Sequence, residues 1–400
     1  MPRLKRRDGV APDGTPLEVL PRSCGVRCSR VRVSLRSRVS MSGASSVNKT
    51  ALIVGASGIV GNNLARHLVN RGWNVVGLAR RPPTDIPGVQ PRSADLLDEG
   101  GLNEALSGLR PSHVFITTWM RQETEAQNID VNSKIVRNLL NAVSNAQSVE
   151  HVALVTGTKH YLGPFEMYGK GAVPVTPFRE ESGRLNIDNF YYAQEDEVFT
   201  AAGRDGFTWS IHRPHTIVGF AVGNAMNMGF TLATYATMCR EFDRPFLFPG
   251  SAVQWNGLTD MTDARLLAQH LEWGSTTEAA CNEDFNIVNG DVFRWNWMWT
   301  RIAKWFGLTP APFPGTGVPL EEQMAGAAAL WTEIVRKYRL SEPDLAKLAP
   351  AWHTDADLGR PIEVVNDMSK SRTLGFLAYQ ATDQSFFDLF SQMRVARLIP

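Results

Sequence analysis

A short glycine-rich turn between a buried strand and a helix is the feature that most constrains how this chain folds. The apolar run 51–54 has the composition of a parallel strand that is buried on both faces. It leads into Gly55-Ala-Ser-Gly58-Ile-Val-Gly61, and apolar residues at helical spacing follow as far as Asn70. A second strand is expected over 74–79, so the whole unit has about 30 residues, the length of one βαβ unit. The sequence therefore predicts an α/β fold with a doubly wound parallel sheet of the Rossmann type.

In this context the three glycines have separate roles in binding a dinucleotide. Gly55 permits the tight turn, Gly58 lets the main chain approach a pyrophosphate, and Gly61 allows the helix to pack closely on the strand. The free N–H groups at the helix N-terminus favour an anion. The other residues of the turn that we expect at the cofactor are Ser57, Ile59 and Val60.

The end of the second predicted strand bears on which dinucleotide is bound. An enzyme specific for NAD usually has Asp or Glu there to bind the ribose 2′-hydroxyl, whereas this chain has Ala79-Arg80-Arg81. Two guanidinium groups suit a 2′-phosphate because they form forked, charge-assisted hydrogen bonds. A solvated basic turn is the alternative, but the missing acid favours NADPH. Asp95 and Leu96 follow the next strand and are expected beside the adenine, although Asp95 is also an ordinary turn residue.

Further strand ends are expected to face the nicotinamide. Strands are predicted over 113–118 and 151–156, and a sixth strand ends near Pro214. Ligands of open α/β sheets lie beyond the carboxyl ends of the strands. The candidate cofactor contacts at these ends are Thr118, Trp119, Thr156, Pro214 and Ile217, and Trp119 is also a candidate substrate contact.

The helix expected to begin near Asn189 lacks the usual catalytic pair of short-chain dehydrogenases. Those enzymes carry Tyr-x-x-x-Lys on this helix, and the lysine one turn later assists the tyrosine. Here Glu195 follows Tyr191 at that spacing, and Asp196 follows Tyr192. Taken alone, this difference argues against an ordinary hydroxyl dehydrogenase.

A resemblance to a known family accounts for the difference. From Ala51 to the C-terminus, the chain resembles the progesterone 5β-reductase/iridoid synthase family of extended short-chain dehydrogenases. The resemblance implies NADPH-dependent reduction of the C=C bond of an enone or enal. It also implies that Tyr191 is the catalytic phenol and that Lys159 replaces the missing helical lysine and holds the nicotinamide ribose. The matching motifs are Gly55–Gly61, Ala79-Arg80-Arg81, Thr156-Gly-Thr-Lys159-His-Tyr-Leu-Gly-Pro-Phe165, Asn189-Phe-Tyr191-Tyr-x-x-Glu195-Asp196, Trp209–Pro214 and Phe285–Phe293.

The implied reaction suits a phenol beside an ammonium group. When hydride adds to the β-carbon, negative charge builds on the carbonyl oxygen, and a hydrogen-bond donor aimed at that oxygen stabilises the resulting enolate. Tyr191 can supply the donor, and the nearby ammonium of Lys159 favours the phenolate and strengthens its hydrogen bonding. A single tyrosine is more often a core residue, and a single lysine is more often a surface residue. The catalytic prediction therefore depends on the motif around Lys159 and the motif around Tyr191 occurring together.

The region after residue 223 is expected to form a mostly helical, substrate-binding lid on the Rossmann core. Eight of the eleven tryptophans lie after Gly250, which indicates an aromatic core, and no basic residues are interleaved as in a nucleic-acid platform. Helices are predicted over 230–241, 263–273, 295–306, 323–338 and 385–395. Trp352 and His353 stand where the family carries an aromatic stretch near the pocket, although His353 as a surface residue is the alternative. The candidate substrate contacts are Trp119, Tyr161, Phe165, Trp352 and His353, and packing is the alternative for Tyr161 and Phe165.

The basic segment 1–48 is left out of the predicted fold. It has no hydrophobic periodicity and is expected to be a disordered leader, with an organelle transit peptide or a start upstream of the functional Met41 as alternatives. The whole chain has 41 basic and 40 acidic residues and no apolar run near the roughly 18 residues of a membrane span, so no nucleic-acid or membrane partner is expected. Cys24 and Cys28 have no second ligand pair, so no metal is expected, and the cytoplasm is the default compartment.

The predicted organisation is a leader (1–48), an NADP-binding Rossmann domain with the catalytic residues (49–222) and a substrate-binding region (223–400). A homodimer is compatible with the sequence. Two other functions stay open. An epimerase, dehydratase or dehydrogenase acting on a ketone, alcohol or sugar predicts the Tyr-x-x-x-Lys motif, which the sequence lacks. A non-enzymatic NADP sensor predicts loss of the catalytic pair, whereas Tyr191 and Lys159 are both present.

Overall fold

The apolar run at the start of the βαβ unit forms β1 (Thr50–Val54) in the parallel sheet of this computed structural model. Its side chains alternate between the two faces of the sheet. Ala51 and Ile53 pack in one apolar cluster and Leu52 and Val54 in another, and all four are at most 1% exposed. A strand buried on both faces requires helices on both faces, as in the predicted fold.

The sheet has the strand order β3-β2-β1-β4-β5-β6-β9, so the direction of winding reverses between β1 and β4. Ligands of open α/β sheets bind at such a switch point. The structure describes residues 49–164, 167–168, 170 and 175–400. The other strands of this sheet are β2 (Asn74–Ala79), β3 (Val89–Ser93), β4 (His113–Ile116), β5 (His151–Val155), β6 (Thr208–Pro214) and β9 (Glu283–Ile287).

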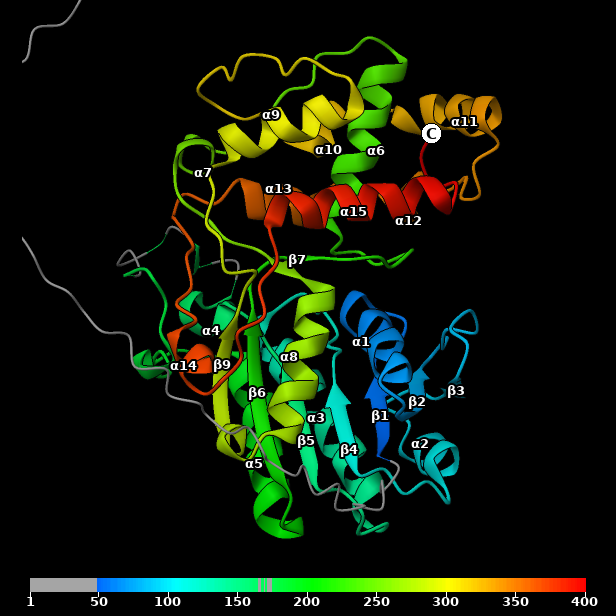
Figure 1. Cartoon of the computed structure of the whole chain (residues 1–400), viewed down its shortest axis with the longest axis vertical. Coiled ribbons are helices and arrows are strands. Elements are labelled where there is room, and N and C mark those ends of the chain that lie inside the picture. Colours follow the sequence, from blue (N-terminus) through cyan, green and yellow to red (C-terminus); the bar gives the residue numbers. More distant parts are fainter. Residues whose placement is uncertain (1–48, 165–166, 169, 171–174) are drawn as a thin grey trace, which may run out of the picture. The chain divides into compact units, whose positions relative to one another are not determined.

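Helices cover both faces of the sheet (Figure 1). One face carries α1 (Ile59–Asn70) and α8 (Ala264–Thr276), whose apolar side chains share a cluster with Ala51 and Ile53. The doubly wound α/β class predicted from the sequence is therefore confirmed. The helices on the opposite face are α2 (Glu99–Leu106), α3 (Glu125–Ser144) and α5 (Phe190–Asp205).

A further group of helices lies over the carboxyl ends of the strands and has an aromatic core of its own (Figure 1). In that core Trp299 stacks on Phe246 with their ring centroids 4.1 Å apart, and Trp295 and Trp331 are at most 2% exposed. The predicted helical region is thus present. Its helices are α6 (Met228–Glu241), α7 (Ala252–Asn256), α9 (Trp295–Phe306), α10 (Leu320–Gln323), α11 (Ala327–Tyr338), α12 (Leu345–Leu348), α13 (Ala351–Leu358) and α15 (Thr382–Val395).

Two expectations about this region need correction. The helix predicted over 323–338 is broken, because Gly326 adopts a left-handed φ of +71° and separates α10 from α11. The region predicted from residue 223 onward is not one continuous layer, because the chain returns from the upper helices to the Rossmann layer in α8 and β9. In the register of β6 with β9, His212 lies opposite Phe285.

The short elements complete the description. No helix in the described part of the chain is long and apolar enough to cross a membrane. The predicted leader, 1–48, lies outside the described residues. The short elements are the paired strands β7 (Ile217–Val218) and β8 (Thr262–Asp263), the helices α4 (Lys159–Leu162) and α14 (Ser369–Thr373), and the 3-10 turns Glu180–Ser182 and Glu278–Ala280.

Candidate active site

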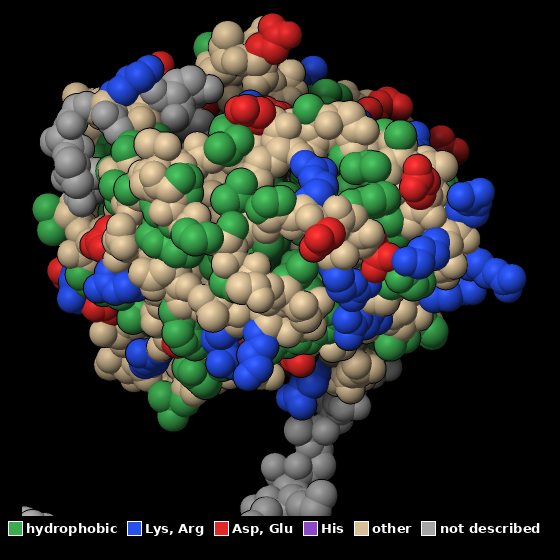
Figure 2. Space-filling view, turned by 90° about the horizontal axis from the view of Figure 1, so that it is seen from above, with side chains coloured by type: hydrophobic (Ala, Val, Ile, Leu, Met, Phe, Trp, Pro, Cys, Tyr) green, Lys and Arg blue, Asp and Glu red, His purple; other side chains and the backbone are tan. Residues whose placement is uncertain are grey.

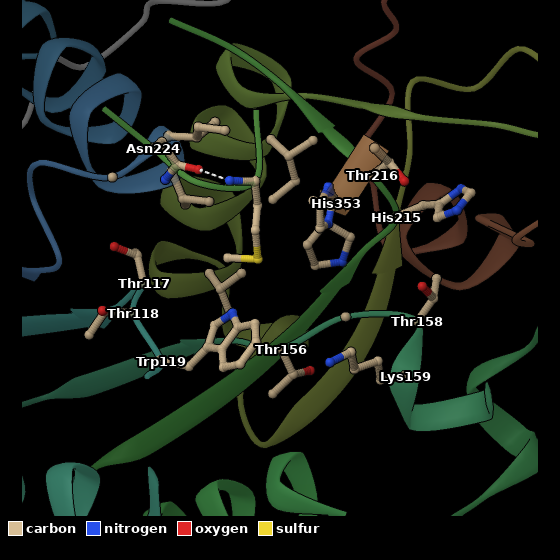
Figure 3. Close-up of a pocket in the computed structure, with 18 of the residues that line it drawn as sticks. Thr117, Thr118, Trp119, Thr156, Thr158, Lys159, His215, Thr216, Asn224 and His353 are labelled. Carbon is tan, nitrogen blue, oxygen red and sulfur yellow. Dashed lines mark hydrogen bonds between the residues drawn. The ribbon is translucent and has the colours of Figure 1, made fainter. Parts of the chain in front are cut away.

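Two adjoining cavities form a cleft at the carboxyl ends of the central strands. One, of about 280 Å³, extends from the glycine turn to α13 (Figure 3), and the other, of about 560 Å³, extends over the end of β2. Gly55, Ser57, Thr118 and Trp119 line both cavities. The cleft is therefore continuous across the switch point of the sheet, where the sequence predicted a dinucleotide.

The glycine turn has the shape that a pyrophosphate needs. Gly55 has a φ of +90°, and the N–H groups of Gly55 and Ala56 donate to the carbonyl oxygen of Leu78. A Cβ on Gly61 would lie 2.3 Å from the carbonyl oxygen of Gly55, so this close approach of helix and turn excludes a side chain. No side chain caps the first turn of α1 after Gly58, and that turn has no acidic residue. These features fit an anionic group at the helix N-terminus.

The second cavity contains the residues predicted to bind the adenosine end of the cofactor. Arg80 and Arg81 follow β2 and line this cavity with exposed side chains. Asp95 and Leu96 line it too, and the Asp95 carboxylate accepts a hydrogen bond from the N–H of Leu97 at 3.0 Å. Asp95 is therefore both a turn-forming residue and part of the cleft wall, so the two interpretations of its position are compatible.

One asparagine joins the two elements that carry the predicted catalytic pair. Lys159 begins α4, and Tyr191 lies in the first turn of α5. Asn189, the N-cap of α5, accepts a hydrogen bond from the N–H of Tyr191 at 3.0 Å and donates one to the carbonyl oxygen of Lys159 at 2.8 Å. Both Lys159 and Tyr191 line the first cavity, and they are 9% and 6% exposed. The fold thus places both residues in one cleft.

Aromatic rings surround the lysine. Its Nζ lies 4.8 Å from the ring centroid of Trp119 and 5.3 Å from that of Phe190. Phe190 contacts Trp119 and Tyr191 in turn, with centroid separations of 4.9 and 4.3 Å. Figure 3 shows Lys159, Trp119 and Thr156 together at the cavity. The ring faces attract the ammonium group and keep water away from it.

Tyr191 is a neutral phenol in this setting. Burial raises the pKa of its hydroxyl well above the ordinary value, and the Glu125 carboxylate acts in the same direction. We expected from the sequence that the ammonium of Lys159 would favour the phenolate. The structure gives the opposite direction, because removal from water is the largest effect on this hydroxyl and the charge of Glu125 adds to it. A neutral phenol is a hydrogen-bond donor, which the expected reaction requires.

Comparison with known proteins identifies the family. A family model described as a PRISE-like Rossmann-fold domain matches residues 106–400. The 3-oxo-Delta(4,5)-steroid 5-beta-reductase of Arabidopsis thaliana is 38% identical over 369 residues, which cover 89% of this chain and 94% of the relative. The chain belongs to the PRISE family. A second relative in this family, the (S)-8-oxocitronellyl enol synthase CYC2 of Camptotheca acuminata, is 37% identical over 88% of this chain and 93% of its own length.

More distant solved structures share the fold of this PRISE chain. The UDP-glucose 4-epimerase of Thermotoga maritima, solved with UDP-glucose, has a TM-score of 0.61 at 13% identity and covers 86% of this chain and 99% of its own. The Bordetella bronchiseptica enzyme WbmG, solved in complex with NAD, has a TM-score of 0.61 at 14% identity, with 89% and 97% covered. At these identities the likeness concerns the fold alone. The family membership, and not this likeness, makes the PRISE chain an oxidoreductase.

The predicted substrate contacts of the PRISE chain fall into different places. Trp119 and His353 line the cavity, and burial lowers the pKa of the His353 imidazole, opposed by the charge of Asp357 and assisted by that of Lys159. His353 is therefore a neutral group of the cleft and not a surface histidine. Phe165 lies outside the described residues.

Tyr161 and Trp352 are not among the described residues that line the cleft. The Tyr161 hydroxyl donates to Asn286 at 2.8 Å and accepts from Arg213 at 3.2 Å. The Trp352 ring lies 4.0 Å from the guanidinium carbon of Arg121. Both side chains thus contact other parts of the protein, and their contact with a substrate stays a prediction.

A buried polar group in the cleft of the PRISE chain was missed from the sequence. Arg360 donates from Nη1 to Nε2 of His215 at 2.8 Å, and Nδ1 of the same imidazole donates to Asp260 at 2.8 Å. The hydroxyl of Thr216 donates to Asp357 at 2.5 Å. His353 and Asp357 lie one turn apart on α13, and Arg360 follows the end of that helix, so recognising α13 would have pointed to this part of the chain. Lining residues that the sequence did not suggest include Tyr168, His215, Thr216, Asn224, Met226, Asp357 and Arg360.

Proposed function

We propose that this protein reduces the activated C=C bond of an enone or enal with NADPH as the hydride donor. The observation that carries the proposal is the neutral phenol of Tyr191 and the side chain of Lys159 in one cleft with a dinucleotide-binding turn. The curated relatives support the substrate class, because they are named as a reductase of 3-oxo-Delta(4,5)-steroids and as (S)-8-oxocitronellyl enol synthases.

The residues of the cleft fit NADPH. The glycine turn and the N-terminus of α1 would hold the pyrophosphate, and Arg80 and Arg81 the 2′-phosphate. The buried hydroxyl of Thr156 has no hydrogen-bond partner within the described part of the chain, as expected where a bound molecule supplies one. Pro214 and Ile217 line the same cavity and would border the nicotinamide. When bound, NADPH supplies the hydride.

The chain's own residues act on the carbonyl end of the substrate. As the β-carbon is reduced, negative charge builds on the carbonyl oxygen, and the phenolic O–H of Tyr191 donates a hydrogen bond to it. The ammonium of Lys159 adds a positive potential in the same cavity. Both effects are strong because the groups are preorganised and largely removed from water. The enolate then takes a proton from water at its α-carbon, which gives the saturated carbonyl compound.

The proposal is tested by following NADPH consumption and identifying the product. The substrates are methyl vinyl ketone, a steroid enone and a dialdehyde enal. We expect a saturated carbonyl product, and much slower turnover in Tyr191→Phe and Lys159→Met. An alcohol product would show that the enzyme reduces the carbonyl group instead. NADPH binding without turnover of any substrate would favour the cofactor sensor.

Tyr338→Phe is the matched control for the loss of one phenolic hydroxyl. Tyr338 lies on α11, is 37% exposed and donates to Glu241 at 2.8 Å, away from the residues that line the cleft. We expect wild-type turnover from this variant. An equal loss in Tyr338→Phe and Tyr191→Phe would remove the assignment of Tyr191 as the donor.

A further inference from the structure

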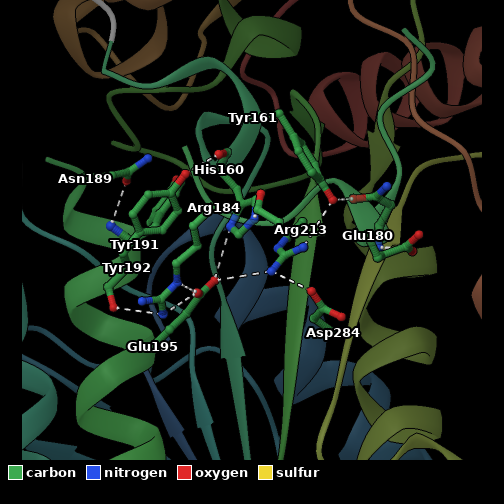
Figure 4. Close-up of polar contacts among 12 residues, drawn as sticks. His160, Tyr161, Glu180, Arg184, Asn189, Tyr191, Tyr192, Glu195, Arg213 and Asp284 are labelled. Carbon is green, nitrogen blue, oxygen red and sulfur yellow. Dashed lines mark hydrogen bonds and ion pairs between the residues drawn. The ribbon is translucent and has the colours of Figure 1, made fainter. Parts of the chain in front are cut away.

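Glu195 occupies the helical position at which ordinary short-chain dehydrogenases carry their catalytic lysine. It lies one turn after Tyr191 on α5, and its side chain is 2% exposed. Figure 4 shows its carboxylate between several nitrogen-bearing side chains. Oε2 accepts from Nη2 of Arg184 at 2.9 Å, and Oε1 lies 3.5 Å from Nδ1 of His160 and 3.7 Å from Nη2 of Arg213. The carboxylate thus connects α5 to its neighbouring elements.

One of these contacts reaches the residue after Lys159. Lys159 and His160 belong to α4, a single turn of helix whose four residues are all buried. Nε2 of His160 donates to the carbonyl oxygen of Gly183 at 3.0 Å, while Nδ1 faces Glu195. The hydrogen bond to Gly183 fixes the imidazole on one side, and on the other side Nδ1 lies against the Glu195 carboxylate without a hydrogen bond between them.

The first turn of α5 also holds the main chain of α4 directly. Asn189 donates to the carbonyl oxygen of Lys159 at 2.8 Å, and the hydroxyl of Tyr192 donates to the carbonyl oxygen of His160 at 2.5 Å. Two successive carbonyl groups of α4 are thus bound by side chains of one helix end. These two hydrogen bonds hold the main chain of α4, and the Glu195 carboxylate lies against the side chain of His160.

Arg213 connects the same group to the sheet. It lies in β6 next to Pro214 of the cleft and is 4% exposed. Its Nη1 donates to the hydroxyl of Tyr161, the third residue of α4, at 3.2 Å, and its Nη2 lies 2.6 Å from Asp284 on β9. Glu195 and Asp284 balance a guanidinium that is otherwise buried in the protein.

Glu195 is ionised and has no contact with the cleft. Burial by itself raises the pKa of its carboxyl, but the nearby His160 imidazole and the positive charges of Arg213 and Arg184 outweigh burial and lower the pKa below its ordinary value. Among the described residues, neither Glu195 nor His160 lines the cleft. Any effect of Glu195 on the reaction must therefore pass through another residue.

We propose that Glu195 is a positioning residue that fixes α4 so that Lys159 reaches the cleft; the inference rests on the function proposed above. In an ordinary dehydrogenase of this type, the lysine projects from the same long helix as the tyrosine and needs no separate support. Here the ammonium is carried by a four-residue turn, which is too short to be stable alone. The negative charge at position 195 supports that turn from 3.5 Å away at His160 and 3.7 Å away at Arg213, which in turn donates to Tyr161 of α4.

A double-mutant cycle with Lys159 tests this role. Glu195→Gln keeps the shape of the side chain and removes its charge. We expect it to lower kcat at least tenfold and to weaken NADPH binding when Lys159 is present. In the Lys159→Met background we expect no further change in either quantity, because the residue through which Glu195 acts is gone. Effects that multiply in the double variant would overturn the proposal.

Asp196→Asn is the matched control. Asp196 is the next residue on α5, its side chain is 60% exposed, and it pairs with Arg184 at 2.8 Å. We expect unchanged kcat and NADPH binding from this variant. A loss equal to that of Glu195→Gln would show that removing either carboxylate in this part of α5 impairs the enzyme, so position 195 would have no special role and the proposal would fail.

If Glu195→Gln does not fold, Tyr192→Phe tests instead whether the position of α4 affects the reaction through Lys159. It removes the hydrogen bond to the carbonyl oxygen of His160 and leaves the charges in place. We expect a smaller loss of kcat, which again disappears in Lys159→Met, at a melting temperature close to that of the wild type. Multiplying effects would again contradict the proposal. If no enone turns over, the proposed function fails, while the NADPH-binding arm of the cycle still decides the role of Glu195.

Discussion

The two ends of the cleft are built by different means. At the adenosine end, main-chain N–H groups and the exposed side chains of Arg80 and Arg81 are offered to the ligand. At the other end, Tyr191 and Lys159 are largely buried and are linked by the Asn189 side chain. Exposed charges are screened by water and salt, whereas buried, fixed groups act at low dielectric. Substitutions at the buried end should therefore impair the reaction, and those at the exposed end should change cofactor binding alone.

The largest effect is expected from Tyr191→Phe. Loss of the only phenolic oxygen that we assign to the enolate should lower kcat about 10²–10³-fold, the typical cost of one oxyanion donor. NADPH binding should change little, because the residues around the pyrophosphate and the 2′-phosphate are untouched. Steady-state kinetics and a binding titration check both parts. A kcat within a few-fold of wild type would show that the buried end of the cleft contributes no more to the reaction than the exposed end.

Gly61→Ala should have the next largest effect. The added Cβ would lie 2.3 Å from the carbonyl oxygen of Gly55, so α1 must move away from the turn. We expect the free energy of unfolding to fall by about 1–3 kcal/mol, as in other overpacked sites, and NADPH to bind more weakly. Denaturant unfolding and a binding titration measure the two changes. Gly203→Ala is the control, because a Cβ there meets no atom within 4 Å.

A moderate effect is expected from the double variant Arg80→Ser/Arg81→Ser. Without the two guanidinium groups, the KM for NADPH should rise about tenfold, equivalent to about 1.4 kcal/mol, while the KM for NADH and the kcat stay the same. Kinetics with both cofactors make the comparison within one protein. Equal changes for NADPH and NADH would show that these arginines do not recognise the 2′-phosphate.

The smallest effect is expected from salt. Raising the ionic strength shortens the distance over which exposed charges act. NADPH binding at the arginine end should weaken gradually, and kcat under saturating NADPH should stay constant because Tyr191 and Lys159 are buried. A series of kinetic measurements at increasing sodium chloride concentration checks this. A kcat that falls with salt as fast as the affinity would contradict a buried catalytic end.

The parts of the molecule that the sequence predicted well are those that depend on residues close together in the chain. The strand, the glycine turn and the start of α1 follow one another between residues 50 and 61, so their pattern is visible locally. The pairing of Lys159 with Tyr191 was inferred from family motifs, and the structure places both in one cleft. Spacing alone could not have predicted it, because the two residues lie on different helices.

The parts that were missed depend on partners that are distant in the chain. Tyr161 follows Lys159 by two residues, yet its hydroxyl meets Asn286 and Arg213 and not the cleft. Such distant partners decide which side chains of a single helical turn face the ligand. The same holds for α13, an eight-residue helix whose stability comes from tertiary contacts. Asp357 in this helix and Arg360 just after it therefore escaped notice.

The path of the chain through the sheet has a consequence for biosynthesis. β6 reaches its outer neighbour β9 only after the chain has made part of the lid and α8. On the ribosome, β6 therefore emerges with an open edge, and open strand edges pair readily with other chains. A nascent chain is exposed to aggregation for the whole interval until β9 is synthesised. Truncations that end before Glu283 should therefore aggregate and not yield a smaller Rossmann domain.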